Sequence, residues 1–92
     1  MHETARIRVI NLLGLHARAA AQLVRLANTF KSEISIARTD NGTAADAKSI
    51  LSVLNLAAAM GTELLIEADG EDAPSAIEAI TQLFANRFGE GA

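Results

Sequence analysis

Three short stretches of this 92-residue chain alternate polar and apolar residues, and each is followed, directly or after a hairpin turn, by a stretch with helical spacing. In the first stretch, residues 5–10, Ile7 and Val9 alternate with arginines. A period of two residues is what a β-strand with one buried face requires. The other alternating stretches are residues 33–38 and 62–69, and a further short strand is expected near residues 43–45, after the first of these. The pattern predicts four half-buried strands, the second and third joined by a tight hairpin turn at Asn41-Gly42.

Three further stretches have helical spacing. Residues 17–30 form an amphipathic pattern, and residues 47–60 follow Asp46, which can cap a helix, and precede Gly61, which can end one. A third helix is expected after Asp72, with Pro74 in its first turn. The predicted buried stripes are Ala20, Leu23, Val24, Ala27 and Phe30 in the first helix, and Ala76, Ile77, Ile80, Leu83, Phe84 and Phe88 in the last. Residues 89–92 are expected to fray, and His2 is expected to lie in a loose terminus.

The element order is therefore β-α-β-β-α-β-α, which predicts an α+β fold. Alternating strands favour a four-stranded, mainly antiparallel sheet, and three helices on one face would leave an open-faced β-sandwich. The length allows one hydrophobic core, and no linker or repeat interrupts the chain, so residues 1–92 are expected to form a single domain.

Composition argues against several classes of function. The net charge is −3 and the chain has neither Tyr nor Trp, so it is poorly equipped to bind nucleic acid, and the predicted open sheet face offers no aromatic residue for RNA. It has no cysteine, no apolar run of membrane-spanning length, and no signal-peptide pattern at its start. We therefore expect a cytoplasmic protein without membrane insertion.

The segment Gly14-Leu15-His16-Ala17-Arg18 places His16 where the first loop enters the first helix. Backbone N–H groups at a helix start lack intrahelical partners and favour an anion. A neutral imidazole there can attack phosphorus, and Arg18 can neutralise phosphoryl oxygens. From spacing alone, His16 as an ordinary polar cap and Arg18 as a solvated surface residue is the more frequent use of such a pair.

The second predicted helix is apolar on all sides, so some of its residues must face outward on a helix that covers a sheet. An exposed apolar patch marks a surface for a partner protein, although a fully buried helix or a homodimer would also account for it. Ser49 falls in the first turn of this helix, where a hydroxyl commonly bonds the backbone. A phosphoryl group there would act by adding charge to the patch.

No other chemistry is indicated. No cluster of carboxylates or histidines has metal-ligand spacing, and no glycine-rich phosphate loop is present, so neither a metal nor a cofactor is expected. A small binding module that dimerises through the second helix, with a function independent of His16, stays open at this point.

Three segments of the chain share one resemblance. They are Gly14-Leu15-His16-Ala17-Arg18-Ala19-Ala20-Ala21-Gln22-Leu23-Val24, Ala47-Lys48-Ser49-Ile50-Leu51, and Gly61-Thr62-Glu63 through Gly70-Glu71-Asp72. In this order they closely resemble the HPr family, the phosphocarriers of the phosphoenolpyruvate-dependent phosphotransferase system. The resemblance spans nearly the whole chain and also implies the open-faced sandwich.

The resemblance implies a carrier and not an enzyme. His16 would become a phosphohistidine at Nδ1, phosphorylated by enzyme I, with Arg18 stabilising the phosphate, and IIA-type proteins would accept the group. Ser49 matches the serine that a dedicated kinase and phosphorylase modify in some bacteria. The positions that match the family's docking surface are Leu15, Ala17, Ile50, Leu51 and Leu54. A monomer is expected, because one docking face must alternate between partners.

Two details go beyond the shared motifs, the first a departure from the family and the second a sign of its branch. Most members have proline after the active-site arginine, whereas this chain has Ala19, which restores a backbone donor near the phosphate. The lead-in Asn11-Leu12-Leu13-Gly14 and the ending Ala85-Asn86-Arg87-Phe88 resemble the nitrogen-related, regulatory branch more than the sugar-transport branch. A regulatory effector whose phosphorylation state reports metabolic status is therefore an alternative to a role in sugar uptake.

Overall fold

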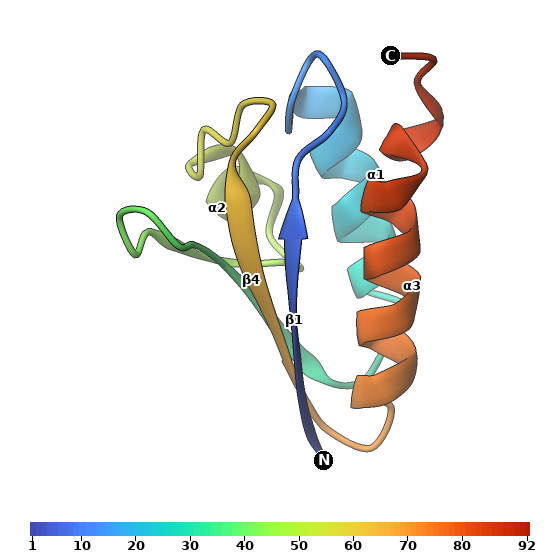
Figure 1. Ribbon diagram of the computed structural model, residues 1–92. Coiled ribbons are helices and arrows are strands. Elements are labelled where there is room, and N and C mark those ends of the chain that lie inside the picture. Colours follow the sequence, from blue (N-terminus) through green and yellow to red (C-terminus); the bar gives the residue numbers. More distant parts are fainter.

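The chain folds as one sheet covered by helices, as a computed structural model of residues Met1 to Ala92 shows (Figure 1). The strands are β1 (His2–Arg8), β2 (Glu33–Arg38), β3 (Ala44–Asp46) and β4 (Glu63–Asp69). The helices are α1 (Ala17–Ala27), α2 (Ile50–Leu54) and α3 (Ala73–Ala85), and a 3₁₀ turn, η1 (Arg87–Gly89), follows α3. This is the predicted element order and the predicted α+β class.

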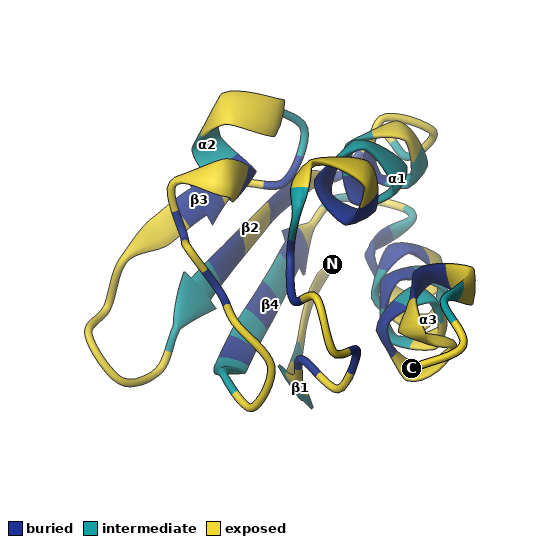
Figure 2. Ribbon diagram, turned by 90° about the horizontal axis from the view of Figure 1, so that it is seen from above, coloured by how far each residue is buried: buried dark blue, intermediate teal, exposed yellow.

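The four strands pair antiparallel in the order β1-β4-β2-β3. Strand β4 lies between β1 and β2, so that Asp69 is opposite both His2 and Glu33. The alternation in β4 is as predicted: Leu64, Ile66 and Ala68 are fully buried. The three helices cover that face, and the opposite face of the sheet is open (Figure 2). His2 is part of β1, so the prediction of a loose N-terminus was wrong.

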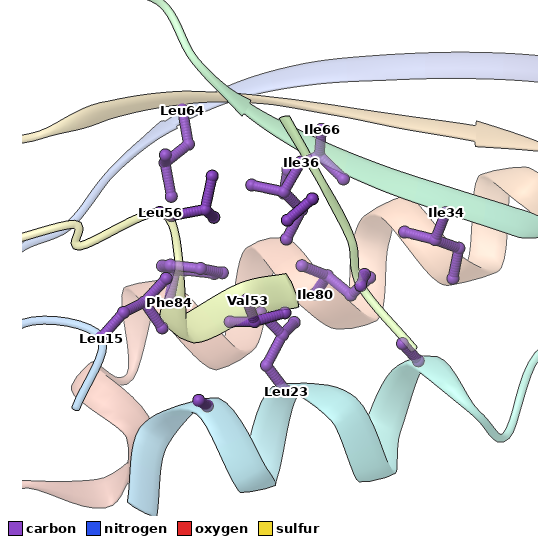
Figure 3. Packing of buried hydrophobic residues seen from close by; sticks show 14 of the residues in the cluster. Leu15, Leu23, Ile34, Ile36, Val53, Leu56, Leu64, Ile66, Ile80 and Phe84 are labelled. Atoms are coloured by element: carbon purple, nitrogen blue, oxygen red, sulfur yellow. The ribbon is translucent and has the colours of Figure 1, made fainter. Parts of the chain in front are cut away.

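The core forms where the helices meet the sheet (Figure 3). Leu23 from α1, Val53 from α2 and Ile80 from α3 point toward the side chains of the sheet. Those sheet residues include Ile36, Leu64 and Ile66, all with no exposed surface. Burying one such aliphatic side chain stabilises the fold by about 1.5–3 kcal/mol, so these interdigitating residues fix how α1 sits on the sheet.

Helix α2 is shorter than predicted, with five residues in place of the stretch 47–60. Asp46 belongs to β3, and Ser49 is the N-cap. After the helix, Ala57 adopts a φ of 49°, and Nη1 of Arg38 donates to the carbonyls of Leu56 and Ala57. Leu56 and Ala58 are both buried, and a spacing of two cannot place both on one helix face. The chain therefore leaves the helix early to bury them.

Asp72 does not cap α3 with its side chain, contrary to the prediction. Its carboxylate accepts hydrogen bonds from the backbone N–H of Lys31 (2.8 Å) and Ser32 (2.9 Å) and from the Ser32 hydroxyl (2.5 Å). The Ser32 hydroxyl, followed by these backbone donors, lowers the pKa of Asp72 to about 2. Asp72 thus fastens the start of β2 to the start of α3.

The C-terminal residues are ordered against the loop that joins β1 to α1, so the predicted fraying of residues 89–92 was wrong. Arg87, Phe88 and Gly89 adopt φ values of 54°, 55° and 78°, a left-handed turn that directly follows α3. Phe88, outside α3 and buried at 3 % exposure, packs edge to face on Phe84. The carbonyl of Ala92 then accepts from the N–H of Leu12 (3.1 Å). Figure 1 shows this end of the chain beside the start of α1.

Candidate functional site

His16 is the N-cap of α1, as predicted from the sequence. Its backbone is extended (φ −72°, ψ 177°), and its carbonyl accepts from the N–H of Ala20 (2.8 Å). Its Nδ1 atom accepts from the N–H of Arg18 at 3.3 Å, which is long for such a bond. The side chain is 28 % exposed, so a partner protein can reach the ring.

The first turn of α1 offers further backbone donors. The N–H groups of Ala17 and Ala19 make no hydrogen bond within the protein. Ala19 itself is fully buried. Together with the N–H of Arg18, these donors and the positive end of the helix dipole favour a negatively charged group beside His16.

The loop before His16 is fixed by a close backbone approach. Gly14 has a φ of +69°, and a Cβ at this position would lie 2.7 Å from the carbonyl oxygen of Ala58. The next residue, Leu15, donates its N–H to the same oxygen (2.9 Å). The side chain of Leu15 is buried in the core at 6 % exposure, so it cannot form part of an exposed docking surface, contrary to the expectation for this residue.

The structure adds Glu90, a residue that sequence reasoning missed. Its Oε2 atom lies 2.5 Å from Nε2 of His16, and its Oε1 atom accepts from Nδ2 of Asn11 (3.0 Å). The bond with His16, followed by the bond from Asn11, holds the pKa of the Glu90 carboxyl below its ordinary value. No local sequence pattern connects Glu90 with His16, because the two residues are far apart in the chain. The only sequence feature near Glu90 that indicated a turn was Gly89.

The two contacts of the ring assign its tautomer. Glu90 is ionised at neutral pH and a carboxylate can only accept, so Nε2 of His16 must carry the proton that bonds it. Nδ1, which accepts from the N–H of Arg18, then carries the lone pair. The arrangement makes Nδ1, at the donor-rich end of α1, the nucleophilic nitrogen of the neutral ring.

The guanidinium group of Arg18 is free for a ligand. Arg18 is exposed, and its side chain makes neither a hydrogen bond nor an ion pair within the protein. It lies close enough to contribute to the lowered pKa of Glu90. A planar guanidinium in this position can bind two phosphoryl oxygens at once.

The apolar surface expected on α2 is present. Ile50, Leu51 and Leu54 are 40 %, 75 % and 36 % exposed. Figure 2 shows the outer side of α2 exposed. Ala17 is also exposed.

Sequence reasoning missed the exposed residues Leu12 and Leu13, and Met60, one of the surplus apolar residues of the second predicted helix, is exposed as well. The first two lie in the loop before α1 and Met60 lies in the loop before β4, and the hydrogen bond from Leu15 to Ala58 joins these loops. The exposed apolar residues therefore extend from α2 toward the loop that carries His16.

Ser49 caps α2, and its hydroxyl accepts from the N–H of Ser52 at 3.4 Å. This is the weak backbone contact that a structural role predicts. Its neighbours in the chain, Ile50 and Leu51, belong to the exposed apolar surface.

The remainder of the surface offers little chemistry. A hollow of about 580 Å³ lies over the strands, lined by polar residues such as Glu33, Glu67 and Lys48, and it includes neither His16 nor Arg18. No three His, Asp or Glu side chains are placed to hold a metal ion. None of the helices has the length and apolar character needed to cross a membrane.

Comparison with known proteins gives consistent results. Residues 3–86 match the family described as PTS HPr component phosphorylation site. The phosphocarrier protein HPr of Cupriavidus necator is 51 % identical over 83 residues, covering 90 % of this chain and 91 % of the relative. That of Neisseria meningitidis serogroup A is 45 % identical over 85 residues, covering 92 % and 93 %.

Solved structures are similar along the same length. The crystal structure of HPr-C-His from Thermoanaerobacter tengcongensis superposes with a TM-score of 0.91 at 33 % identity, covering 98 % of this chain and 99 % of that chain. HPr from Bacillus anthracis gives a TM-score of 0.82 at 36 % identity, with 88 % and 94 % covered.

Proposed function

This chain belongs to the HPr family and is a phosphocarrier, not a catalyst, and on that premise we propose that His16 is the residue that carries the phosphoryl group. The observation that carries the proposal is the contact between Nε2 of His16 and Glu90, because it holds the ring proton on Nε2 and leaves the lone pair on Nδ1. The second histidine of the chain, His2, also lies near a carboxylate, with Oε2 of Glu67 3.3 Å from its Nε2, but it is in β1 and therefore lacks the backbone donors of a helix start.

The transfer step follows from this geometry. The Nδ1 lone pair forms a bond to phosphorus while the bond from phosphorus to the donor's leaving atom breaks, and that atom keeps the electron pair. The long contact from the Arg18 N–H to Nδ1 is weak, so this N–H can turn to a phosphoryl oxygen together with those of Ala17 and Ala19. The Arg18 guanidinium neutralises the remaining charge.

Glu90 serves both directions of transfer. Phosphorylation at Nδ1 leaves the proton on Nε2, and the carboxylate stabilises whatever positive charge the ring develops. When the group passes to an acceptor, the ring returns to the same tautomer without having to turn over. The carrier is therefore ready for the next transfer.

The partners are proteins of the phosphotransferase system, as the family implies. We propose enzyme I as the donor and IIA-type proteins as acceptors, all docking on Ala17, Ile50, Leu51 and Leu54. The charge of the partner's phosphoryl group would be received by Arg18 at the edge of this surface. The proposal also keeps two expectations from the sequence, a cytoplasmic location and a monomer whose docking face is free to alternate between partners.

The Asn11-Leu12-Leu13-Gly14 lead-in supports acceptors of the regulatory, nitrogen-type branch. Comparing the initial rates of phosphoryl transfer to purified nitrogen-type and sugar-specific IIA proteins tests this. Faster transfer to sugar-specific IIA proteins would remove the assignment.

Ser49 is proposed as a regulatory phosphorylation site for a serine kinase and phosphorylase. Its position next to Ile50 and Leu51 supports this, because a phosphoryl group there would place two negative charges on the apolar docking surface. Ser49→Asp should slow transfer from enzyme I without lowering the free energy of unfolding. Unchanged transfer by a stoichiometrically phosphorylated protein would contradict the regulatory role.

Intact-mass analysis tests the carrier function. The wild type, His16→Ala and the matched control His2→Ala are incubated with enzyme I, phosphoenolpyruvate and Mg²⁺. The wild type and His2→Ala should each gain one acid-labile phosphoryl group, and His16→Ala none. Phosphorylation of His16→Ala would refute the assignment, and failure of the wild type with its own enzyme I would favour a binding module with the HPr fold.

A further inference from the structure

Asn11 is a fully buried polar residue in the loop between β1 and α1. Its side-chain amide donates one hydrogen bond to the carbonyl of Gly14 (2.8 Å) and one to Oε1 of Glu90 (3.0 Å). Both hydrogens of Nδ2 are thereby used. The backbone repeats the first link, because the N–H of Gly14 donates to the carbonyl of Asn11 (3.1 Å). Asn11 thus connects the loop that carries His16 with Glu90, the residue near the C-terminus that contacts the His16 ring.

The burial of Asn11 carries a cost for the stability of the fold. Its Oδ1 atom is buried and has no hydrogen-bond partner, which is unfavourable for the stability of the fold. The other buried polar residue, Ser32, has its hydroxyl bonded to Asp72. An apolar side chain in its place would leave the carbonyl of Gly14, which accepts no other hydrogen bond, and Oε1 of Glu90 without this donor. A polar group that is kept at a cost to stability points to a role in the site.

We propose that Asn11 is a positioning residue for phosphoryl transfer: it orients the carboxylate of Glu90 so that this carboxylate keeps the proton on Nε2 of His16. The inference deepens the proposed function, on which it rests. It assigns a role to a side chain that touches neither the phosphoryl group nor a partner protein.

The geometry of the carboxylate supports this role. The two carboxylate oxygens of Glu90 have different partners: Oε1 accepts a hydrogen bond from Asn11, and Oε2 bonds His16. Two fixed contacts define both the position and the plane of the carboxylate, whereas one contact leaves it free to rotate. Without the amide, the competing partner is Arg18, whose charge already acts on Glu90. The proton of the ring would then no longer be held at Nε2.

The test reads the ring directly. The ¹⁵N chemical shifts of the His16 ring distinguish the two neutral tautomers, and they are recorded for the wild type and Asn11→Asp without any donor. Asn11→Asp keeps the size of the side chain and replaces the donor by an acceptor that repels Glu90. The control is Asn28→Asp, because Nδ2 of Asn28 also donates to two acceptors, the carbonyls of Val24 and Lys48, away from the site.

The expected result is a ring protonated at Nε2 in the wild type and in Asn28→Asp, and a mixture of tautomers in Asn11→Asp. The maximal rate of phosphorylation by enzyme I should fall about 10- to 100-fold in Asn11→Asp, a range typical for residues that orient a working histidine. The KM for enzyme I should stay unchanged, because the docking surface is intact. Asn11→Ser removes the same amide without adding a charge, and it replaces Asn11→Asp if that variant does not fold.

Two outcomes would overturn the inference. One is an unchanged tautomer in a folded Asn11 variant, and the other is a loss of rate no greater than that of Asn28→Asp. The ring tautomer is measured without enzyme I, so this arm gives its answer even if the wild type proves not to be phosphorylated at His16. Absence of phosphorylation at His16 in the wild type would refute the proposed function. Asn11 would then be a residue that orients a histidine with a different role.

Discussion

Nε2 of His16 and Oε2 of Glu90 lie 2.5 Å apart although 74 residues separate them in the chain. The contact makes the two nitrogens of the ring unequal, with a proton held on one and a lone pair left on the other. Both side chains are only partly exposed, 28 % for His16 and 18 % for Glu90, so water competes weakly for the contact. The asymmetry of the ring is the basis for the first prediction.

Glu90→Gln should slow the phosphorylation of His16 by enzyme I by about tenfold. The amide keeps the shape of the side chain but has no charge, and it can also turn its NH₂ group to Nε2, which favours the wrong tautomer. Glu78→Gln is the matched control, because Glu78 is exposed on α3 and bonds no other side chain. Equal initial rates for the two variants would show that the contact does not contribute to transfer.

Ala19→Pro should shorten the half-life of the phosphohistidine about fivefold, the equivalent of one lost hydrogen bond of about 1 kcal/mol. Proline removes the N–H of Ala19, which makes no hydrogen bond within the protein and which the proposed transfer step assigns to a phosphoryl oxygen. Ala19→Gly keeps the N–H and should keep the half-life. The loss of ³²P from the isolated phosphoprotein at neutral pH measures it, and the same half-life in both variants would remove the idea.

Gly14→Ala should destabilise the protein more than Gly42→Ala. Both glycines have positive φ values, 69° and 76°, so both substitutions carry the left-handed penalty of about 1–2 kcal/mol. Only at Gly14 does the added Cβ also meet backbone, 2.7 Å from the oxygen of Ala58; at Gly42 no atom lies within 4 Å. Urea denaturation gives both free energies of unfolding. Equal losses would mean that the two loops can separate without cost.

Leu51→Ser should raise the KM for enzyme I about fivefold or more, as for a residue at the centre of an interface. Leu51 is 75 % exposed, so the free energy of unfolding should change by no more than about 0.5 kcal/mol. Ile80→Ala is the opposite case, because Ile80 is fully buried. It should cost about 2–5 kcal/mol of stability and leave the KM of the folded protein unchanged. A Leu51→Ser protein with normal KM would place the docking surface elsewhere.

Asp72→Asn should lower stability at pH 7 and have a diminishing effect in acid. The pKa of Asp72 is depressed to about 2 by the Ser32 hydroxyl and the backbone donors, so its contribution is complete above the ordinary aspartate pKa of about 4. As the pH falls from about 4 toward 2, the wild-type carboxyl becomes protonated and this contribution is lost. Urea midpoints of wild type and variant should converge over that interval, and a constant difference down to pH 2 would contradict the assignment.

The parts of this molecule that were predictable from sequence are those set by neighbouring residues. The alternation Leu64, Ile66, Ala68 determines which face of β4 is buried, and the change from loop to amphipathic pattern after Leu15 places His16 at the start of α1. The surplus of apolar residues after Ser49 correctly indicated an exposed apolar surface. These features follow from local periodicity and capping.

The errors arise where distant segments compete for the same residues. Asp72 has the sequence of a helix cap, but three donors at Lys31 and Ser32 take its carboxylate. The sequence does not show where α2 ends, since the stretch is apolar on all sides. The burial of Leu56 and the hydrogen bond from Arg38 to its carbonyl determine the end of the helix. Glu90 was missed for the same reason, since only the finished fold brings it to His16.

The turn at Arg87, Phe88 and Gly89 has a consequence for the synthesis of the protein. The ribosome makes His16 early and Glu90 long afterwards, and the turn that points Glu90 at the ring contains Phe88, which packs on Phe84. A growing chain therefore displays the histidine before it has the carboxylate that fixes its proton. Until the last segment has emerged and packed on the core, His16 lacks the contact that holds its proton on Nε2.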